Sequence, residues 1–354
     1  MNLIIINHEL FSDKSMVTIT QDKDSKSYRY LKAENIVPRD DAFHGDINLI
    51  DVEWWYFDGI FDNDYSVHIG VRTYHLKNSG FIESRINIYK NGKVEVEASK
   101  RDFFSNFNIS YDSPDLEINN KPIIRFDKEY YKKTGKWKYH VSLKINDNEV
   151  DLVFVGTTQG WKIETSETCW TVALPKAKVS GKIHFNGKTL DVKGVGYHDH
   201  NWGYTATTIF TNIGWFWGRV TGDLLTITWA KTMITPERGD LLAIVNQDSN
   251  GISDKNEYYS ISPTNINFIA KNFIKKNRQR IPTEFDLRII NKISDDDFTI
   301  NADIHMKTFY TQHSRIFTAH YFRYHVKAFG EITLGSKTEL LDNKTQIMEF
   351  LSFK

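Results

Sequence analysis

The sequence predicts an almost entirely β protein built from two fused β-barrel or β-sandwich domains. Short runs of alternating polar and apolar residues recur along the chain, with turn signals about every 8–12 residues, as in sandwiches and barrels. Aromatic residues are abundant (23 Phe, 17 Tyr and 9 Trp), and they favour half-buried sheet surfaces. A length of 354 residues is more than one hydrophobic core usually serves, so two domains are expected.

The individual strands are predicted from their alternation and their turns. Two hairpins are expected at residues 84–96 and 181–192, because each has Asn-Gly between alternating runs, the strongest short-range hairpin signal. Helical periodicity is scarce, and its best candidate is residues 264–276. Further strands are expected at residues 65–71, 137–145, 149–155, 224–230, 241–246, 284–291, 298–305, 317–327 and 331–334.

The pattern of residues along the chain suggests an N-terminal arm followed by two domains. Residues 1–45 are polar and irregular and are expected to form an N-terminal arm. A dense motif ends at Gly203, so we place the first β domain at residues 46–204 and the second at residues 205–354. No exact internal repeat relates the two domains.

Composition argues against several classes of protein. Lys+Arg and Asp+Glu both number 45, whereas a nucleic-acid-binding protein normally carries a basic excess. No apolar run approaches the ~20 residues of a membrane helix, and the apolar N-terminal residues 3–6 are too few for a signal sequence. The single cysteine, Cys169, leaves no internal disulfide and fits a reducing compartment. We therefore expect a cytoplasmic protein without a nucleic-acid partner or a transmembrane segment.

Three aromatic-rich motifs stand out from the alternating runs of the rest of the chain. They are Glu-Trp-Trp-Tyr-Phe-Asp-Gly at 53–59, Gly-Val-Gly-Tyr-His-Asp-His-Asn-Trp-Gly at 194–203, and Gly-Trp-Phe-Trp-Gly-Arg-Val at 214–220. Residues two apart on a strand share a face, so Tyr197, Asp199 and Asn201 point one way. His198, His200 and Trp202 point the other way.

The first of these faces places a carboxyl group beside a phenol and an amide. If it lines a pocket, desolvation raises the pKa of Asp199 and makes it a plausible proton donor. Hydrating or cyclising an alkene requires such a donor, together with aromatic faces that tolerate a carbocation through cation–π attraction. Trp54 with Tyr56, and Trp215 with Trp217, supply aromatic faces at a spacing of two.

The first two motifs carry a resemblance to a known family. Glu-Trp-Trp-Tyr, followed much later by Gly-x-Gly-Tyr-x-Asp-His-Asn-Trp-Gly, resembles the AttH/CrtC-like superfamily. That group includes bacterial carotenoid 1,2-hydratases (hydroxyneurosporene synthases), with fungal lipocalin-like Diels–Alderases and plant tocopherol cyclases as more distant relatives. The resemblance runs from Glu53 to the end of the chain and includes residues 321–332 and Glu349.

The resemblance implies two tandem lipocalin-like (calycin) β-barrel or sandwich domains, with a ligand pocket at or near their junction and no organic cofactor. It also implies that Asp199 occupies the position of the acid in the carotenoid hydratases, with Tyr197 beside it. The chain departs from those hydratases near Trp170, because no histidine lies between Asp151 and Ile183. This departure argues against carotenoid hydration itself and leaves the cyclase branch open.

Our leading hypothesis is a cofactor-independent enzyme that acts on a hydrophobic polyene or terpenoid-like substrate by hydration, cyclisation (including the Diels–Alder type) or isomerisation. Asp199 and Tyr197 are the candidate catalytic residues. A pericyclic cyclase would need no acid, only a substrate held in its reactive conformer. A non-catalytic binder or carrier of an apolar molecule is the alternative from another class. The candidate substrate-binding residues are Trp54, Tyr56, Trp170, Asn201, Trp215, Trp217 and Arg219.

Structural interpretations compete with these assignments. Trp55 and Trp202 fit core or interdomain packing, and Asp199 with Asn201 fits a structural hydrogen-bond hub that ties together the crossing between the two halves. His198 and His200 share a face as paired metal ligands can, but no third ligand is spaced to complete a site, so no metal is expected.

Two further side chains and one cavity complete the expectations. Glu53 is a candidate for a buried ion pair with Arg219 or Arg72. Cys169 is expected to be an inert buried thiol. A largely apolar cavity is expected beside the junction of the domains, between Asp199 on one side and Trp217 on the other.

Overall fold

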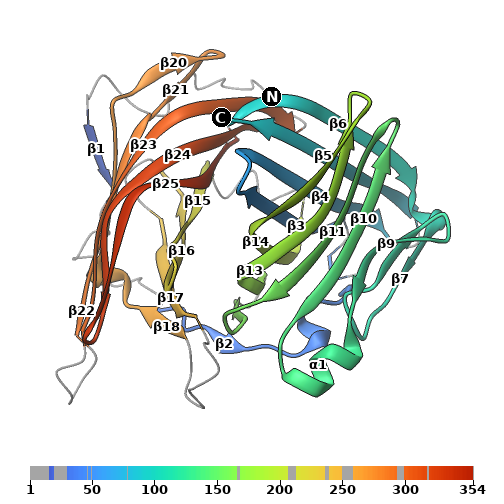
Figure 1. The fold of residues 1–354 in the computed structure, drawn as a ribbon, viewed down its shortest axis with the longest axis horizontal. Coiled ribbons are helices and arrows are strands. Elements are labelled where there is room, and N and C mark those ends of the chain that lie inside the picture. The colour runs from blue at the N-terminus through green and yellow to red at the C-terminus, as the bar shows by residue number, and fades with distance from the viewer. Residues whose placement is uncertain are drawn as a thin grey trace, which may run out of the picture. The chain divides into compact units, whose positions relative to one another are not determined.

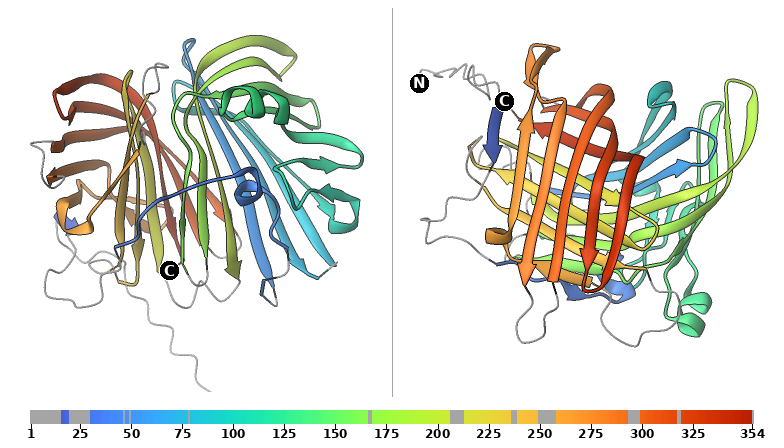
Figure 2. Two further views of the ribbon diagram at one scale, coloured as in Figure 1. Left: turned by 90° about the horizontal axis from the view of Figure 1, so that it is seen from below. Right: turned by 60° about the vertical axis from the view of Figure 1, so that its left-hand side comes forward.

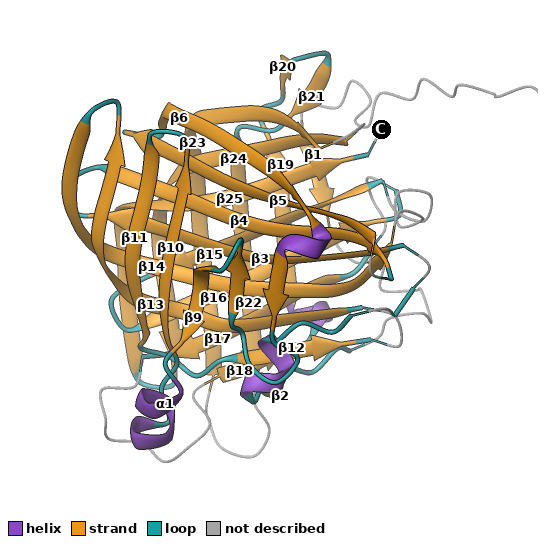
Figure 3. Ribbon diagram, turned by 90° about the vertical axis from the view of Figure 1, so that its right-hand side faces the viewer, coloured by secondary structure: helices purple, strands orange, loops and turns teal. Residues whose placement is uncertain are grey.

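The computed structural model confirms the all-β fold. It describes residues 16–19, 30–45, 47–48, 50–77, 79–165, 168–205, 213–235, 239–248, 258–292, 299–316 and 319–353. Strands hold 74% of these residues and helices 6%, so strands dominate the ribbon in Figure 3. No helix among the described residues is long and apolar enough to cross a membrane.

The chain divides into two compact units. Unit 1 comprises Met1–Tyr30, Ile209–Val245 and Ser260–Lys354, and unit 2 comprises Leu31–Thr208 and Asn246–Tyr259. Each unit is organised around one large sheet.

The sheet of unit 2, called sheet B, is an antiparallel sheet of 13 strands. Its main path is β6-β5-β4-β3-β14-β13-β11-β10-β9-β8-β7, with β12 paired to β13 and β2 paired to β12. The strong curvature of its strands is visible in Figure 1. The elements of unit 2 are β2 (Glu34–Asn35), η1 (Pro38–Asp41), β3 (Asp51–Phe61), β4 (Tyr65–Leu76), β5 (Ser79–Lys90), β6 (Lys93–Phe103), η2 (Phe104–Asn106), β7 (Phe107–Ile109), β8 (Leu116–Ile118), β9 (Lys121–Phe126), α1 (Lys128–Thr134), β10 (Lys138–Ile145), β11 (Asn148–Gly156), β12 (Trp161–Glu164), β13 (Cys169–Phe185) and β14 (Lys188–Thr205).

The second sheet, called sheet A, belongs mostly to unit 1 and is a nearly closed antiparallel barrel of 10 strands in the order β1-β19-β22-β23-β24-β25-β15-β16-β17-β18. The strands β22 to β25 lie side by side in the right-hand view of Figure 2. The elements that build sheet A and the small β20-β21 hairpin are β1 (Met16–Ile19), β15 (Gly214–Thr221), β16 (Leu225–Met233), β17 (Leu241–Gln247), β18 (Tyr258–Ile261), η3 (Pro263–Asn265), β19 (Ile266–Lys271), β20 (Ile274–Lys276), β21 (Gln279–Ile281), β22 (Glu284–Lys292), β23 (Thr299–Ile316), β24 (Ala319–Leu334) and β25 (Lys337–Ser352).

Both predicted Asn-Gly hairpins are confirmed. Asn186 and Gly187 join β13 to β14 with φ of 50° and 71°. Asn91, at φ 48°, lies in the turn that joins β5 to β6. Positive φ at both central residues is the condition of a type I′ turn, which matches the twist of the strands on either side.

The predicted helix at 264–276 is wrong. This stretch forms the short turn η3 and then the strands β19 and β20. In β19, the side chains of Ile266, Phe268 and Ala270 are buried with a period of two, so pairing with β22 overrides the weak helical pattern. The helix α1 was not predicted. It begins at the cap Asp127, whose side chain accepts a hydrogen bond from the Tyr130 backbone N–H, and it ends at the left-handed Gly135.

The core of unit 2 lies against one face of β3 and β14, which we call the core face of sheet B. Trp55 and Phe57 of β3 belong to the buried apolar cluster there, together with Tyr139 of β10 and Phe154 of β11. The other face of the same two strands carries the polar group considered next.

Candidate functional site

The first two sequence motifs lie on neighbouring strands. β3 pairs with β14 in an antiparallel register that sets Tyr56 opposite Asp199 and Trp54 opposite Asn201. On its other side β14 pairs with β13, where Trp170 is opposite Asn201. Two motifs separated by more than a hundred residues of sequence therefore present one surface, as cross-strand neighbours on the same face do.

Asp199 is the centre of this surface. Its carboxylate is buried, with a residue exposure of 5%. Oδ2 accepts hydrogen bonds from the Tyr197 hydroxyl at 2.8 Å and from Trp170 Nε1 at 2.9 Å. Oδ1 accepts one from Asn201 Nδ2 at 3.2 Å. The structure thus brings together the side chains of four residues that the sequence singled out.

The donors around Asp199 differ in what they can do with a proton. The indole N–H of Trp170 and the amide N–H of Asn201 only donate, whereas the Tyr197 hydroxyl both donates and accepts. The hydrogen bond between Tyr197 and Asp199 can therefore carry its proton on either oxygen. Trp170 and Asn201 hold the carboxylate in place in both cases.

Aromatic side chains surround this polar group. The Tyr56 ring lies 6.0 Å from the Tyr197 ring in an edge-on arrangement, and its hydroxyl donates to Asp58 Oδ2 at 3.1 Å. The Trp170 ring meets the Trp161 ring edge-on at 5.2 Å.

Trp54, opposite Asn201, has a cation and a second ring beside it. Its ring lies 5.3 Å from the Arg72 guanidinium carbon and 4.7 Å from the Tyr204 ring. The Asp199 face of sheet B is therefore polar at its centre and aromatic around it.

The third motif belongs to unit 1. Trp215, Trp217 and Arg219 alternate along β15 on the face opposite Phe216, which packs in the core of sheet A against Phe350. Arg219 is fully buried and donates to the Thr221 hydroxyl at 3.0 Å. The cavity expected between Asp199 and Trp217 stays a prediction.

A buried ion pair lies on strands close to this motif in sheet A. Glu349 is opposite Trp217 in the register of β25 and β15, and opposite Arg323 in that of β25 and β24. Arg323 Nη2 lies 2.6 Å from Glu349 Oε1. Sequence reasoning noted both residues as part of the family pattern but gave them no role.

The core face of sheet B carries the histidines of the second motif. The His198 ring stacks on Phe57 at 3.8 Å, and its Nδ1 lies 2.9 Å from the Tyr56 carbonyl oxygen. Because a carbonyl only accepts, this Nδ1 carries a proton. Nε2 lies 3.0 Å from Asp41 Oδ2, which also accepts from the Tyr139 hydroxyl at 2.5 Å.

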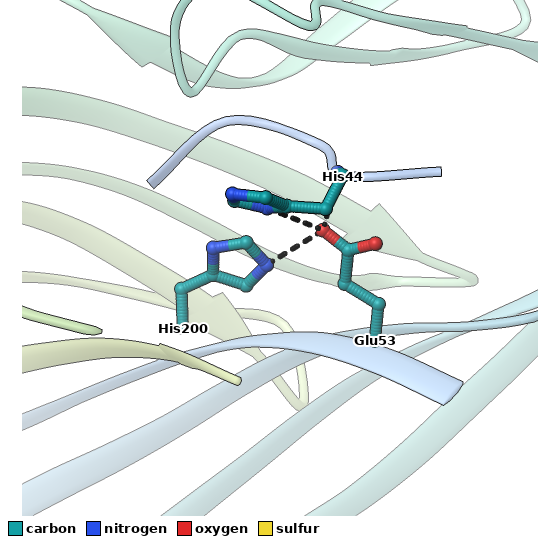
Figure 4. Close-up of side chains that lie close together, drawn as sticks. All are labelled: His44, Glu53 and His200. Carbon is teal, nitrogen blue, oxygen red and sulfur yellow. Dashed lines mark hydrogen bonds and ion pairs between the residues drawn. The ribbon is translucent and has the colours of Figure 1, made fainter. Parts of the chain in front are cut away.

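His200 lies two residues further along β14, on the same face as His198. Its ring stacks on Trp55 at 4.4 Å, and its Nε2 lies 2.8 Å from Glu53 Oε1. Glu53 Oε1 also accepts from the His44 backbone N–H at 3.0 Å and lies 3.6 Å from His44 Nδ1 (Figure 4). Glu53 thus lies against two histidines, whereas the sequence suggested an arginine as its partner.

Burial perturbs the titration of this cluster. Desolvation raises the pKa of Glu53 well above its ordinary value of 4.5. Desolvation, reinforced by His44 and His198, lowers the pKa of His200 well below 6.5. Desolvation, followed by the charge of Arg39, lowers the pKa of His44 to about 4.

Cys169 is buried, and burial raises the pKa of its thiol to about 12. A thiol with so high a pKa is a poor nucleophile at neutral pH. The prediction of an inert cysteine agrees with this environment.

Sequence reasoning missed Asp41, His44 and Tyr139. Asp41 and His44 lie in the stretch predicted to be an irregular arm, and Asp41 is fully buried. A buried acidic residue has no local sequence signature. Nothing in the sequence of this stretch indicated its contacts with β14.

The fold and the arrangement of the motifs define an all-β protein built on two large antiparallel sheets. Among solved structures, the chain is similar to an AttH-type protein of Nitrosomonas europaea, with a TM-score of 0.58 and 12% identity over 92% of this chain and 99% of the other. It is also similar to kievitone hydratase of Nectria haematococca, with a TM-score of 0.50 and 12% identity over 94% and 95% of the two chains. At these identities the likeness shows a common fold. No protein-family model and no curated protein matches the sequence.

Proposed function

We propose that this protein is a cofactor-independent enzyme that moves a proton to or from a carbon atom of a hydrophobic, unsaturated small molecule. Hydration, isomerisation and proton-initiated cyclisation of a polyene or terpenoid-like substrate all belong to this class. The solved structure of a hydratase with a similar fold supports the proposal. The observation that carries it is the buried pair of Tyr197 and Asp199, whose oxygens lie 2.8 Å apart.

The proposed chemistry uses the ability of this pair to hold a proton on either oxygen. In a hydration, the pair gives its proton to one alkene carbon, which forms a C–H bond and leaves a cation on the neighbouring carbon. The oxygen of a water molecule then bonds to the cation, and a proton of that water returns to the pair. In an isomerisation, the pair takes a proton from a second carbon instead, and the double bond moves.

The aromatic side chains have a separate role in this proposal. The faces of Trp54, Tyr56 and Trp170 stabilise a developing cation by cation–π attraction, and Asn201 keeps the carboxylate oriented. Trp215, Trp217 and Arg219, which alternate along β15 in unit 1, stay predicted substrate-binding residues.

The test combines a substrate panel with solvent deuterium. The purified protein is incubated in D₂O with polyenes, terpenoids and prenylated or phenolic alkenes, chosen first from any ligand that co-purifies and is identified by mass spectrometry. Mass spectrometry then detects water addition or isomer formation. We expect the product to carry deuterium on carbon, because the transferred proton exchanges with solvent.

Asp199→Asn is the decisive variant. It is nearly isosteric and lacks the exchangeable acidic proton, so we expect turnover to fall at least ~100-fold, the usual contribution of a general acid or base. Asp191→Asn is the matched control, because Asp191 is an exposed aspartate on the same strand. Circular dichroism verifies that both variants fold.

Other outcomes identify the alternatives. Full turnover in folded Asp199→Asn, with no deuterium in the product, would establish a pericyclic cyclase and refute the proton-transfer proposal. Tight binding of an apolar ligand without turnover of any panel member would favour a carrier. Failure of Asp199→Asn to fold, while Asp191→Asn folds, would assign Asp199 to a structural hub; Tyr197→Phe then tests the proton step, and it refutes the proposal if it leaves turnover unchanged.

A further inference from the structure

A set of three potential metal ligands converges on the core face of sheet B. His44, Glu53 and His200 each offer one ligand atom, and these atoms all lie within 4.8 Å of one another. His200 Nε2 and His44 Nδ1 lie 2.8 Å and 3.6 Å from the same carboxylate oxygen of Glu53. Figure 4 shows the two imidazole rings directed at this oxygen.

We propose that His44, Glu53 and His200 form a binding site for a divalent transition-metal ion, with Zn²⁺ as the reference ion. Two histidines and one glutamate are an established zinc ligand set that leaves a position open for water. Zinc lies ~2.0–2.2 Å from nitrogen and oxygen ligands, which holds adjacent ligand atoms about 3.3 Å apart. The distances of 2.8 Å and 3.6 Å lie on either side of that value, so small side-chain shifts admit the ion.

Both imidazole rings are already oriented. The His200 ring stacks on Trp55 at 4.4 Å with an interplanar angle of 9°. The His44 ring stacks on Trp202 at 4.0 Å with an angle of 16°. Rings fixed in this way lose little freedom when an ion binds, which favours affinity.

The surroundings also contain an outer carboxylate. Metal-bound histidines usually direct their second ring nitrogen toward a carboxylate or a carbonyl. His200 Nδ1 lies 3.6 Å from Asp41 Oδ1, and both side chains are fully buried. Asp41 is itself held by Tyr139 and His198.

One buried nitrogen atom of the cluster has no hydrogen-bond partner of normal geometry. Among the described residues, this atom is His44 Nδ1. Such atoms are uncommon in folded proteins and call for a physical explanation. A bound ion accounts for His44 Nδ1 directly, because the ion takes its lone pair.

The site has a route to solvent and a structural consequence. The His44 side chain is 12% exposed, so an ion can reach the cluster from the surface. A bound ion would tie the segment before β3 to both β3 and β14. Since the ligands lie on the face opposite Asp199, this inference goes beyond the proposed enzyme activity and does not depend on it.

Metal uptake by the full-length protein tests the proposal. The protein is stripped with EDTA and then titrated with ZnCl₂ by calorimetry, and with CoCl₂ by visible absorption. We expect a single tightly bound ion per chain, Co²⁺ bands typical of four or five ligands, and a rise in melting temperature with Zn²⁺.

His44→Gln is the key variant, because the His44 side chain is partly exposed and its loss is compatible with folding. We expect it to weaken Zn²⁺ affinity at least ~10-fold and to abolish the Co²⁺ bands. His140→Gln is the matched control, since His140 is an exposed histidine on β10. Asp199→Asn should bind the ion like the unaltered protein, which separates this proposal from the enzymatic one.

Two results would overturn the metal site. One is an unaltered protein, folded by circular dichroism, that binds no Zn²⁺ or Co²⁺ specifically. The other is a folded His44→Gln protein that binds both ions as well as His140→Gln does. Either result would reduce the cluster to a structural hydrogen-bond network.

Discussion

Lys231 of β16 is a lysine enclosed by unit 1. The residue has no exposed surface, and its Nζ donates to the Gly239 carbonyl oxygen at 2.6 Å. Desolvation lowers the pKa of Lys231 from 10.5 to about 8, although the charge of Asp240 acts in the opposite direction. The folded protein therefore binds this proton less tightly than the unfolded chain does.

This depressed pKa predicts a specific dependence of stability on pH. Between pH 8 and 10.5 the unfolded chain holds a proton that the folded protein has lost, so the free energy of unfolding rises with pH across this window. The contribution is at most about 3 kcal/mol. Urea unfolding of the unaltered protein and of Lys231→Met is compared from pH 7 to 11. The difference between the two gives the contribution of Lys231 to the pH dependence of the free energy of unfolding.

The comparison has a matched control. Lys188→Met removes an exposed lysine, and its stability should follow the pH dependence of the unaltered protein. Equal pH slopes for the unaltered protein and Lys231→Met would show that the Lys231 ammonium is well solvated after all.

At the residue scale, the sequence predicted one of the two polar clusters. Alternation on a strand was enough to group Tyr197, Asp199 and Asn201, because the rule acts within one element. The opposite cluster depends on contacts between residues far apart in the chain. His198 and Asp41 are 157 positions apart, and Tyr139 and Asp41 are 98 apart, so only the tertiary fold brings them together.

At the scale of elements, the glycines of the second motif allow β14 to lie close to its neighbours. A Cβ atom on Gly194 would lie 2.1 Å from the Ile60 carbonyl oxygen of β3, and one on Gly196 would lie 2.7 Å from the Phe154 ring. The Gly-x-Gly spacing is therefore a packing requirement of sheet B. The two glycines let β14 pack closely against its neighbours just before Tyr197 and Asp199.

Gly194→Ala should consequently destabilise the protein. The added methyl group meets main-chain atoms, which cannot turn aside as a side chain can, so we expect the free energy of unfolding to fall by about 1–3 kcal/mol. Lys193→Ala, at the exposed neighbouring position, should change it by less than about 0.5 kcal/mol. A Gly194→Ala protein as stable as Lys193→Ala would show that β14 does not need this close approach.

Elements with strong local sequence signals were predicted well. Elements whose conformation depends on pairing with neighbouring strands were not. The hairpin of β13 and β14 could be read from Asn186-Gly187, because few residues tolerate its positive φ values. The strand β19 could not be predicted, because its conformation is fixed by pairing with β22 and β1. The short helix α1 has typical capping residues, Asp127 and Gly135. Its 7 residues are too few for a helical period to be recognised in the sequence.

At the scale of the whole molecule, each unit is assembled from separate stretches of chain. Unit 2 consists of Leu31–Thr208 and a later segment, Asn246–Tyr259. In that segment, Asn246 accepts a hydrogen bond from Trp161 Nε1 at 3.1 Å and donates one to the Gln159 carbonyl at 3.0 Å. Asp248 pairs with Lys176 at 2.7 Å.

Asn246→Ala should therefore destabilise unit 2, although residue 246 comes long after most of that unit. Asn246 is fully buried, and its loss leaves the indole N–H of Trp161 unpaired in the interior. We expect a loss of about 1–3 kcal/mol in urea unfolding followed by tryptophan fluorescence. Asn108→Ala, an exposed asparagine on β7, is the control and should be close to neutral; equal effects of the two substitutions would contradict this account.

The discontinuous path also sets an order of events during synthesis on the ribosome. β1 leaves the ribosome early, yet its pairing partner β19 spans Ile266–Lys271. The backbone groups of β1 cannot pair with β19 until some 250 further residues have been made. At about 5–20 residues per second this takes tens of seconds. Unit 2, whose last residue is Tyr259, is available in full before β19 is. The first strand among the described residues is thus paired only after unit 2 has been made, and a nascent chain stalled before residue 266 would display it as an open edge that chaperones or other chains can bind.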